Sequence, residues 1–135
     1  MSNEQTLSII KPDAVERNLS EDIKNFFKKN NLNIKDSKKI QITKDEAAEF
    51  YKVHQSKPFY SDLCAYLSSG PIEVMILEGK NAILANRALM GATDPKKADE
   101  NTIRKLYGIS IDKNSVHGSD SLENAKKEIN FFFKN

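Results

Sequence analysis

The chain has 135 residues and a formal net charge of +2, and 30% of its residues are charged, so acidic and basic side chains nearly cancel. This length predicts a single domain over residues 1–135. No stretch approaches the roughly 20 apolar residues that cross a bilayer, the first residues lack a signal-peptide pattern, and the lone cysteine excludes an internal disulfide. We therefore expect a soluble, cytoplasmic protein with no membrane partner.

Apolar periodicity predicts alternating elements in the order β-α-β-α-α-β-α-β-α. The expected strands cover residues 6–10, 34–42, 72–77 and 115–117, and the expected helices begin near residues 20, 43, 61, 81 and 121. Several polar or small residues indicate where helices begin and end. We expect Ser20 and Ser61 to be N-caps, Thr43 and Glu46 to form a capping box, and Gly91 to end the helix before it.

The order of the elements indicates the fold class. Without the additional helices it reduces to βαββαβ, the split βαβ arrangement. We therefore expect an α/β protein of the α+β kind, a ferredoxin-like βαββαβ sandwich in which helices cover a four-stranded antiparallel sheet. The nearly continuous apolar run at 72–77 is typical of a strand buried on both faces. Residues 92–115 hold only one helical turn, at 102–107, and we expect such a long irregular segment to be functional.

The stretch NSVHGSDS at residues 114–121 places one of the two histidines, His117, between a short strand and a helix cap. Gly118 gives the backbone freedom, and free N–H groups at the helix start favour a nearby anion. A neutral imidazole in this setting can serve as a nucleophile, a base or a metal ligand. The absence of a Cys/His cluster argues against zinc, and the absence of G-x-S-x-G argues against a serine hydrolase. Spacing alone leaves both a nucleophile or base and a plain turn histidine open.

Arginine is scarce among the 21 basic residues, which are mostly lysines. The lysines are scattered, which is typical of solvated faces and argues against a nucleic-acid partner. Only Arg17, Arg87 and Arg104 offer the planar fork that grips a phosphate with two hydrogen bonds. The Gly-rich phosphate motifs and the protein-kinase motifs are absent. A bound nucleotide would therefore depend on these arginines, Lys11 and the segment 92–115.

Three other side chains have an ordinary structural interpretation. Phe59 could be an exposed aromatic platform, but a core position is the default for an aromatic residue. Cys64, between apolar neighbours, is expected to be a small buried hydrophobe. His54 is expected on the surface of a helix.

The stretch NSVHGSDS resembles the active-site signature of the nucleoside diphosphate kinase family. Further stretches resemble the same family, and together they cover nearly the whole chain: TLSIIKPDAVER, FYKVHQSKPFYSDL, SSGPIEVMILEG, NRALMGATDP and NTIRKLYG. Together these stretches are highly specific for the family. Taken singly, only the histidine signature is specific. The resemblance implies that the chain transfers the γ-phosphate of a nucleoside triphosphate such as ATP to a nucleoside diphosphate. The mechanism it implies is ping-pong, through a phosphohistidine at His117.

The resemblance also implies roles for individual residues around His117. They are Lys11, Arg87, Thr93 and Arg104 for the phosphates, Lys11 and Asn114 for the sugar, Phe59 and Ile111 for the base, and Tyr51 and Glu128 beside the histidine. The carboxylate of Glu128 would orient the imidazole ring. Mg²⁺ is the implied cofactor, bridging the phosphates with no side chain as its ligand.

The implied partners are nucleotides, including ATP, ADP and GDP, and further copies of the chain in a homo-oligomer, either a tetramer or a hexamer, that is built from dimers. Stacking alone reads no base edge, so it predicts broad nucleotide acceptance. Two rival interpretations are a non-catalytic phosphohistidine carrier and a ferredoxin-like nucleic-acid-binding module. The available phosphate ligands argue against the first, and the near-neutral charge argues against the second.

The chain departs from the family at several positions. Asn18, Glu21, Asn31 and Asn101 stand where the family often has glycine. Because Asn101 directly precedes Thr102-Ile-Arg104, the backbone of the nucleotide loop is open to change at this point. Leu106 stands where an acidic or polar residue is common.

Overall fold

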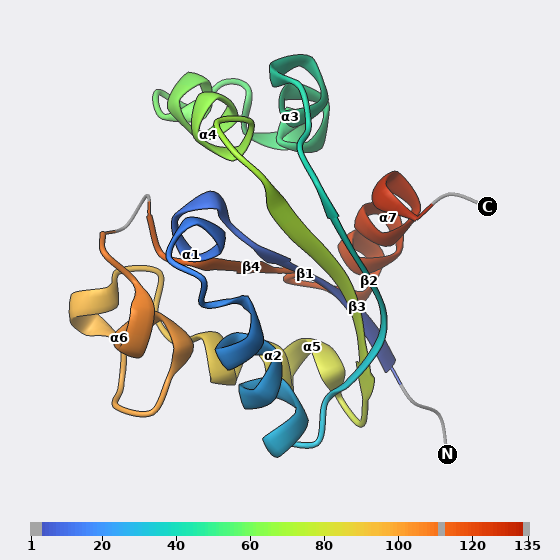
Figure 1. The fold of residues 1–135 in the computed structure, drawn as a ribbon. Helices are drawn as coiled ribbons and strands as arrows, with labels where there is room; N and C mark the ends of the chain where they lie inside the picture. The colour runs from blue at the N-terminus through green and yellow to red at the C-terminus, as the bar shows by residue number, and fades with distance from the viewer. Residues whose placement is uncertain (1–3, 111–112, 134–135) are drawn as a thin grey trace.

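The computed structural model of the chain describes residues 4–110 and 113–133. Its strands are β1 (Glu4–Ile10), β2 (Asn33–Ile40), β3 (Ile72–Gly79) and β4 (Val116–Gly118). They form a four-stranded sheet in the order β2-β3-β1-β4, and each pair of neighbours is antiparallel. The expected ferredoxin-like arrangement is therefore confirmed (Figure 1).

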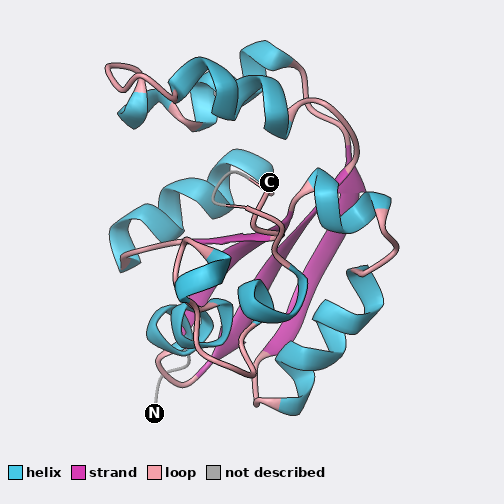
Figure 2. Ribbon diagram, turned by 90° about the vertical axis from the view of Figure 1, so that its left-hand side faces the viewer, coloured by secondary structure: helices cyan, strands magenta, loops and turns pink. Residues whose placement is uncertain are grey.

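Helices lie on both faces of this sheet. They are α1 (Pro12–Glu16), α2 (Ser20–Lys29), α3 (Lys44–Phe50), α4 (Tyr60–Leu67), α5 (Ala82–Met90), α6 (Ile103–Tyr107) and α7 (Leu122–Phe132), with 3₁₀ turns at Lys52–His54 and Pro95–Lys97. Figure 1 and Figure 2 show α3 and α4 side by side at one end of the sheet. Across the described part of the chain, no helix has the length and apolar character required to cross a bilayer.

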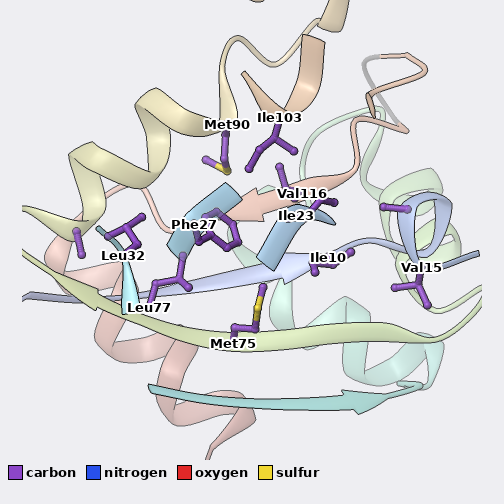
Figure 3. Close-up of a cluster of buried hydrophobic side chains, with 12 residues drawn as sticks. Ile10, Val15, Ile23, Phe27, Leu32, Met75, Leu77, Met90, Ile103 and Val116 are labelled. Atoms are coloured by element: carbon purple, nitrogen blue, oxygen red, sulfur yellow. The ribbon is translucent and has the colours of Figure 1, made fainter. Parts of the chain in front are cut away.

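The sheet separates two buried apolar clusters, and β3 shows why. Every residue of β3 except Glu78 is buried, as its apolar sequence predicts. Because neighbouring side chains of a strand point to opposite faces, Val74 and Met75 belong to different clusters. Met75 lies in the cluster that includes Phe27 of α2 (Figure 3), whereas Val74 lies in the cluster that includes Leu67 of α4.

The helix boundaries follow most of the expected signals. The capping box of α3 is confirmed, since Glu46 N–H donates to Thr43 Oγ1 at 3.1 Å and Thr43 N–H donates to Glu46 Oε1 at 2.9 Å. The caps expected at Ser20 and Ser61 are wrong, because both serines lie inside their helices and no side chain caps either one. Helix α1 was not expected; it begins at Pro12, whose fixed φ suits a first helical position.

Asparagine takes the place of glycine where the backbone is left-handed. The φ angles of Asn18, Asn31 and Asn101 are 62°, 68° and 66°. Asparagine tolerates this region better than most side chains because its short amide can bond locally. The departure at Asn101 therefore keeps a backbone conformation that glycine also adopts. Glu21 is different, since it is an ordinary residue of the first turn of α2.

Candidate active site

The predicted site residues line one cavity of about 820 Å³. Its lining includes all of those that the structure describes: Lys11, Tyr51, Phe59, Arg87, Thr93, Arg104, Asn114, His117 and Glu128. The remaining one, Ile111, lies outside the described residues. Side chains from the two ends of the sequence and from the long segment 92–115 therefore share one concave surface.

The pairing of β1 with β4 brings the two ends of the sequence together. Ile9 lies opposite His117 in this antiparallel register, and Lys11 follows directly after β1. The Lys11 N–H donates to the carbonyl of Ser115 at 2.8 Å. The lysine and the residues just before the histidine are consequently neighbours in space.

His117 is held through one ring nitrogen. Its Nε2 lies 3.1 Å from Glu128 Oε1, and the same carboxylate oxygen accepts from Ser119 Oγ at 2.7 Å. The two side chains of this pair are 22% and 20% exposed, so the ring remains accessible from the cavity. Ser119 is itself fixed by Leu7 of β1, whose N–H donates to Ser119 Oγ at 3.3 Å.

Aromatic rings form the wall beside the histidine. The Phe50 ring meets the His117 ring edge-on, with centroids 5.3 Å apart. Tyr51 packs against Phe50 with centroids 5.1 Å apart and is buried. Burial, followed by the nearby Cys64 and Glu128, raises the pKa of the Tyr51 phenol above its ordinary value. The Tyr51 hydroxyl therefore stays protonated at neutral pH and can act as a hydrogen-bond donor.

A chain of polar contacts links Lys11 to the segment 92–115. Lys11 Nζ donates to Asn114 Oδ1 at 3.0 Å, and Asn114 Nδ2 donates to the carbonyl of Thr93 at 3.1 Å. Lys11 and Asn114 are buried, although both line the cavity. These contacts hold the Lys11 ammonium and the Asn114 amide in place on the wall of the cavity that His117 also lines.

Arg104 provides a second fixed cation. Its guanidinium donates to the carbonyls of Gly91 and Val116 at 3.0 and 2.9 Å, so its position is set from two sides. Burial and the neighbouring Arg87 lower the pKa of Arg104 to about 10, which leaves it charged at neutral pH. A desolvated arginine repelled by a second arginine nearby is suited to an anionic ligand.

Phe59 lies at the start of α4 with 44% of its surface exposed. The core position that its residue type suggested is therefore wrong, and the ring of Phe59 is exposed at the cavity instead. Its ring centroid is 6.2 Å from that of His54, which lies in a 3₁₀ turn and lines the same cavity rather than an outer helix surface. Cys64 is buried, as expected.

A family profile described as nucleoside diphosphate kinase matches residues 4–135. The chain belongs to the nucleoside diphosphate kinase family. It is 58% identical over 130 residues to the nucleoside diphosphate kinase of a Nitratiruptor species, covering 96% of this chain and 95% of that one. It is also similar to the crystal structure of the Aquifex aeolicus nucleoside diphosphate kinase, with a TM-score of 0.96, 39% identity and coverage of 99% and 97%.

The apo nucleoside diphosphate kinase structure from Encephalitozoon cuniculi is similar as well, with a TM-score of 0.94, 37% identity and coverage of 98% and 90%. The chain is therefore an enzyme, a phosphotransferase that moves the γ-phosphate of a nucleoside triphosphate to a nucleoside diphosphate. The family performs this reaction in two half-reactions through a phosphohistidine.

The sequence prediction missed several residues that shape the cavity. Ser119 bonds the carboxylate that holds His117, Phe50 packs against the imidazole, and Asp120 lies on the cavity wall. A hydrogen bond from Asn124, opposed by some burial, lowers the pKa of Asp120 below its ordinary value. Ser119 and Asp120 could have been found, because they belong to the same NSVHGSDS stretch, whereas nothing in the sequence around Phe50 indicates its contact.

Proposed function

We propose that His117 is the nucleophile and that its Nδ1 atom takes the phosphoryl group. A carboxylate only accepts hydrogen bonds, so the contact between Nε2 and Glu128 Oε1 assigns the ring proton to Nε2. The lone pair is then on Nδ1, the nitrogen left for attack. This contact, inside a cavity that also holds fixed cations, is the observation that carries the proposal.

In the first half-reaction, Nδ1 forms a bond to the γ-phosphorus of a nucleoside triphosphate while the bond from that phosphorus to the β,γ-bridging oxygen breaks. The diphosphate leaves with the bond electrons, and the ring, still protonated at Nε2, becomes positively charged. The Glu128 carboxylate stabilises this charge and holds the ring in one orientation. In the second half-reaction, a β-phosphate oxygen of another diphosphate takes the phosphoryl group, and the neutral ring returns.

Lys11, Arg87, Thr93 and Arg104 hold the phosphates in this proposal. Phosphoryl transfer requires positioning and charge neutralisation more than covalent machinery. The contacts from Arg104 to two backbone carbonyls and from Lys11 to Asn114 support it, because they orient the cations before the substrate arrives. The Tyr51 hydroxyl, a permanent donor beside the histidine, is proposed to steady the transferring group.

Phe59 is proposed to stack on the base, with Lys11 and Asn114 bonding the sugar hydroxyls. The exposure of the Phe59 ring at the cavity supports this role. Every base has a π-face, so stacking without base-edge hydrogen bonds favours acceptance of ATP, ADP, GDP and other nucleotides. Ile111 is proposed near the other face of the base on the family resemblance alone.

Mg²⁺ is proposed as the cofactor, bound to the phosphate oxygens of the nucleotide and to water. This arrangement requires no cluster of acidic side chains, because Mg²⁺ commonly binds through substrate phosphates. When bound, the ion would neutralise phosphate charge beside the phosphates that Lys11, Arg87, Thr93 and Arg104 would hold. No side chain is assigned to it as a ligand.

We further propose that the chain acts as one domain over residues 1–135, in the cytoplasm, where a supply of nucleoside triphosphates exists. We propose a homo-oligomer, either a tetramer or a hexamer, that is built from dimers. Strand β2 supports it, because it lies at the edge of the sheet and its outer backbone groups are available to a second chain. Light scattering of the purified protein would measure the number of chains.

The decisive experiment is single-turnover labelling with γ-labelled ATP and Mg²⁺ in the absence of an acceptor. We expect up to one acid-labile phosphate per chain, together with release of ADP. His117→Ala should remove the label and lower the turnover rate by at least about 10⁴-fold, because the nucleophile itself is lost. His54→Ala is the matched control and should keep the label. A phosphohistidine carrier would remain unlabelled by ATP, and labelling of the His117→Ala protein would refute the assignment.

A further inference from the structure

A buried carboxylate lies outside the lining of the nucleotide cavity and beside a second pocket. Asp13 belongs to the first turn of α1 and is 5% exposed, and it is not among the described residues that line the cavity. It bonds Arg17, Tyr66 and Ser115, and these four residues are named the Asp13 cluster here. None of the other three lines the cavity in the described part of the chain.

The Asp13 cluster is densely bonded. Asp13 Oδ2 accepts from Arg17 Nη2 at 3.1 Å and from Ser115 Oγ at 3.0 Å, and Asp13 Oδ1 accepts from the Tyr66 hydroxyl. The Asp13 N–H donates back to the Tyr66 oxygen at 2.9 Å. Burial, followed by the hydrogen bond to Asp13, raises the pKa of the Tyr66 phenol, so it remains a donor. A buried charge needs such compensation, and here it comes from residues up to 102 positions away.

One member of the cluster has a strained backbone. Ser115 is fully buried with a φ of 75°, and the Val116 N–H donates to the Asn114 carbonyl at 2.9 Å across it. A hydrogen bond between residues two apart around a positive φ defines the rare form of the γ-turn, which persists only where its surroundings hold it. The bond from Ser115 Oγ to Asp13 provides that support. The turn separates Asn114 from the strand that carries His117.

Each bond of the cluster reaches a segment that carries a proposed nucleotide ligand. Asp13 is two residues after Lys11, and Ser115 is one residue after Asn114. Tyr66 lies on α4, the helix that begins after Phe59. Through Arg17 the cluster also reaches α6, because Arg17 Nη2 donates to the Tyr107 carbonyl at 2.5 Å at the end of the helix that carries Arg104.

We propose that the Asp13 cluster is a positioning device for phosphoryl transfer from nucleotides, fixing the four segments that hold the nucleotide without touching it. The proposal rests on the proposed function, since it assumes that those segments bind the nucleotide. Its residues are positioning residues, because they act only through Lys11, Asn114 and the other ligands. Among the residues that the structure describes, no side-chain hydrogen bond joins the cluster to the His117–Glu128 pair, so the attacking ring should be independent of it.

The test compares two phosphoryl donors on the full chain. Phosphoramidate is a small donor that phosphorylates imidazoles and has no base or sugar to be positioned. Ser115→Ala and Tyr66→Phe each delete one hydroxyl of the cluster, and Asp13→Asn removes its charge. We expect single-turnover labelling by ATP and Mg²⁺ to slow between about 10-fold and about 100-fold in each variant, whereas labelling by phosphoramidate, which has only its phosphoryl group to be held, slows far less.

Tyr60→Phe is the matched control, because Tyr60 lies on the same helix and its hydroxyl donates to a backbone carbonyl, that of Ala48, at 2.9 Å. It should leave labelling by either donor unchanged. The proposal is overturned if Ser115→Ala and Tyr66→Phe label with ATP as fast as Tyr60→Phe. It is also overturned if both donors slow in parallel, which is the signature of a general structural role. If Asp13→Asn fails to fold, the two hydroxyl deletions decide the matter. A wild-type protein that neither donor labels would instead refute His117 as the nucleophile.

Discussion

Two carboxylates of this enzyme collect hydrogen bonds, and they do so in opposite settings. Glu128 bonds His117 and Ser119, which lie 11 and 9 positions away, and its side chain is 20% exposed at the cavity. Asp13 bonds Arg17 at the end of its own helix and Tyr66 and Ser115 on two other segments, and its side chain is 4% exposed. The first carboxylate is near a ring whose charge changes during the reaction, and the second is near groups that only need to stay in place.

The difference teaches how one small domain separates reaction from placement. A carboxylate that must stabilise a changing charge benefits from partial hydration, because nearby water can reorient as the charge on its partner changes. A carboxylate that fixes backbone segments benefits from burial, because hydrogen bonds are stronger where water competes less. We infer that the two clusters divide the work, with ring orientation assigned to Glu128 and nucleotide placement assigned to Asp13. Substitutions should separate these two functions.

The largest effect is expected for Glu128→Gln. The amide keeps the shape but loses the charge that supports the positively charged ring, and a charge-assisted hydrogen bond contributes about 1.5–3 kcal/mol. Labelling should therefore slow between about 10-fold and about 100-fold with ATP and with phosphoramidate alike, measured as single-turnover rates. Glu123→Gln, an exposed position on the same helix, is the control. Slowing with ATP alone would assign Glu128 to nucleotide placement and break the comparison.

A smaller effect is expected for Phe59→Ala, on the placement side. Loss of base stacking of about 1–3 kcal/mol should raise the KM for ATP and GTP by similar factors of about 10-fold, with little change in kcat. Steady-state kinetics with both nucleotides would measure this, and Phe59→Tyr, which keeps the ring, should behave as wild type. Labelling by phosphoramidate should not change. A KM effect confined to one base would contradict stacking as the mode of recognition.

The smallest effect is expected at Asn101, just before the residue that caps α6. Its φ of 66° favours glycine or asparagine, whereas alanine there costs about 1–2 kcal/mol. Asn101→Ala should lower the melting temperature by a few degrees, and Asn101→Gly should stay near the wild-type value, as measured by circular dichroism. Because Thr102 caps the helix that carries Arg104, we also expect ATP labelling by the alanine variant to slow slightly. Equal melting temperatures for the two variants would show that the left-handed backbone is not maintained in solution.

The sequence was a good guide to the elements that have one strong local signal. The strand expected at 72–77, which the structure extends to Ile72–Gly79, was predicted from a nearly continuous apolar run, because a strand covered on both faces requires one. The capping box before α3 was predicted from two residues, since both of its hydrogen bonds are local. A single serine near a helix start was a less reliable signal for the N-cap position. Ser20 and Ser61 were both expected to be caps, and both lie inside their helices.

Site residues that lie close together in the sequence were easier to predict than those that the fold brings together. Residues 114–121 carry the histidine, its glycine and the helix cap in one stretch, so local sequence alone determined that an imidazole is presented beside a helix start. The identities of Lys11, Arg87 and Arg104 as the scarce candidates for phosphate binding were also available from the sequence. The exposure of Phe59, the contact of Phe50 with the imidazole and the burial of Asp13 were decided only by tertiary structure. Each of them depends on segments that meet through the sheet and its covering helices, and no local pattern encodes a distance between residues a hundred positions apart.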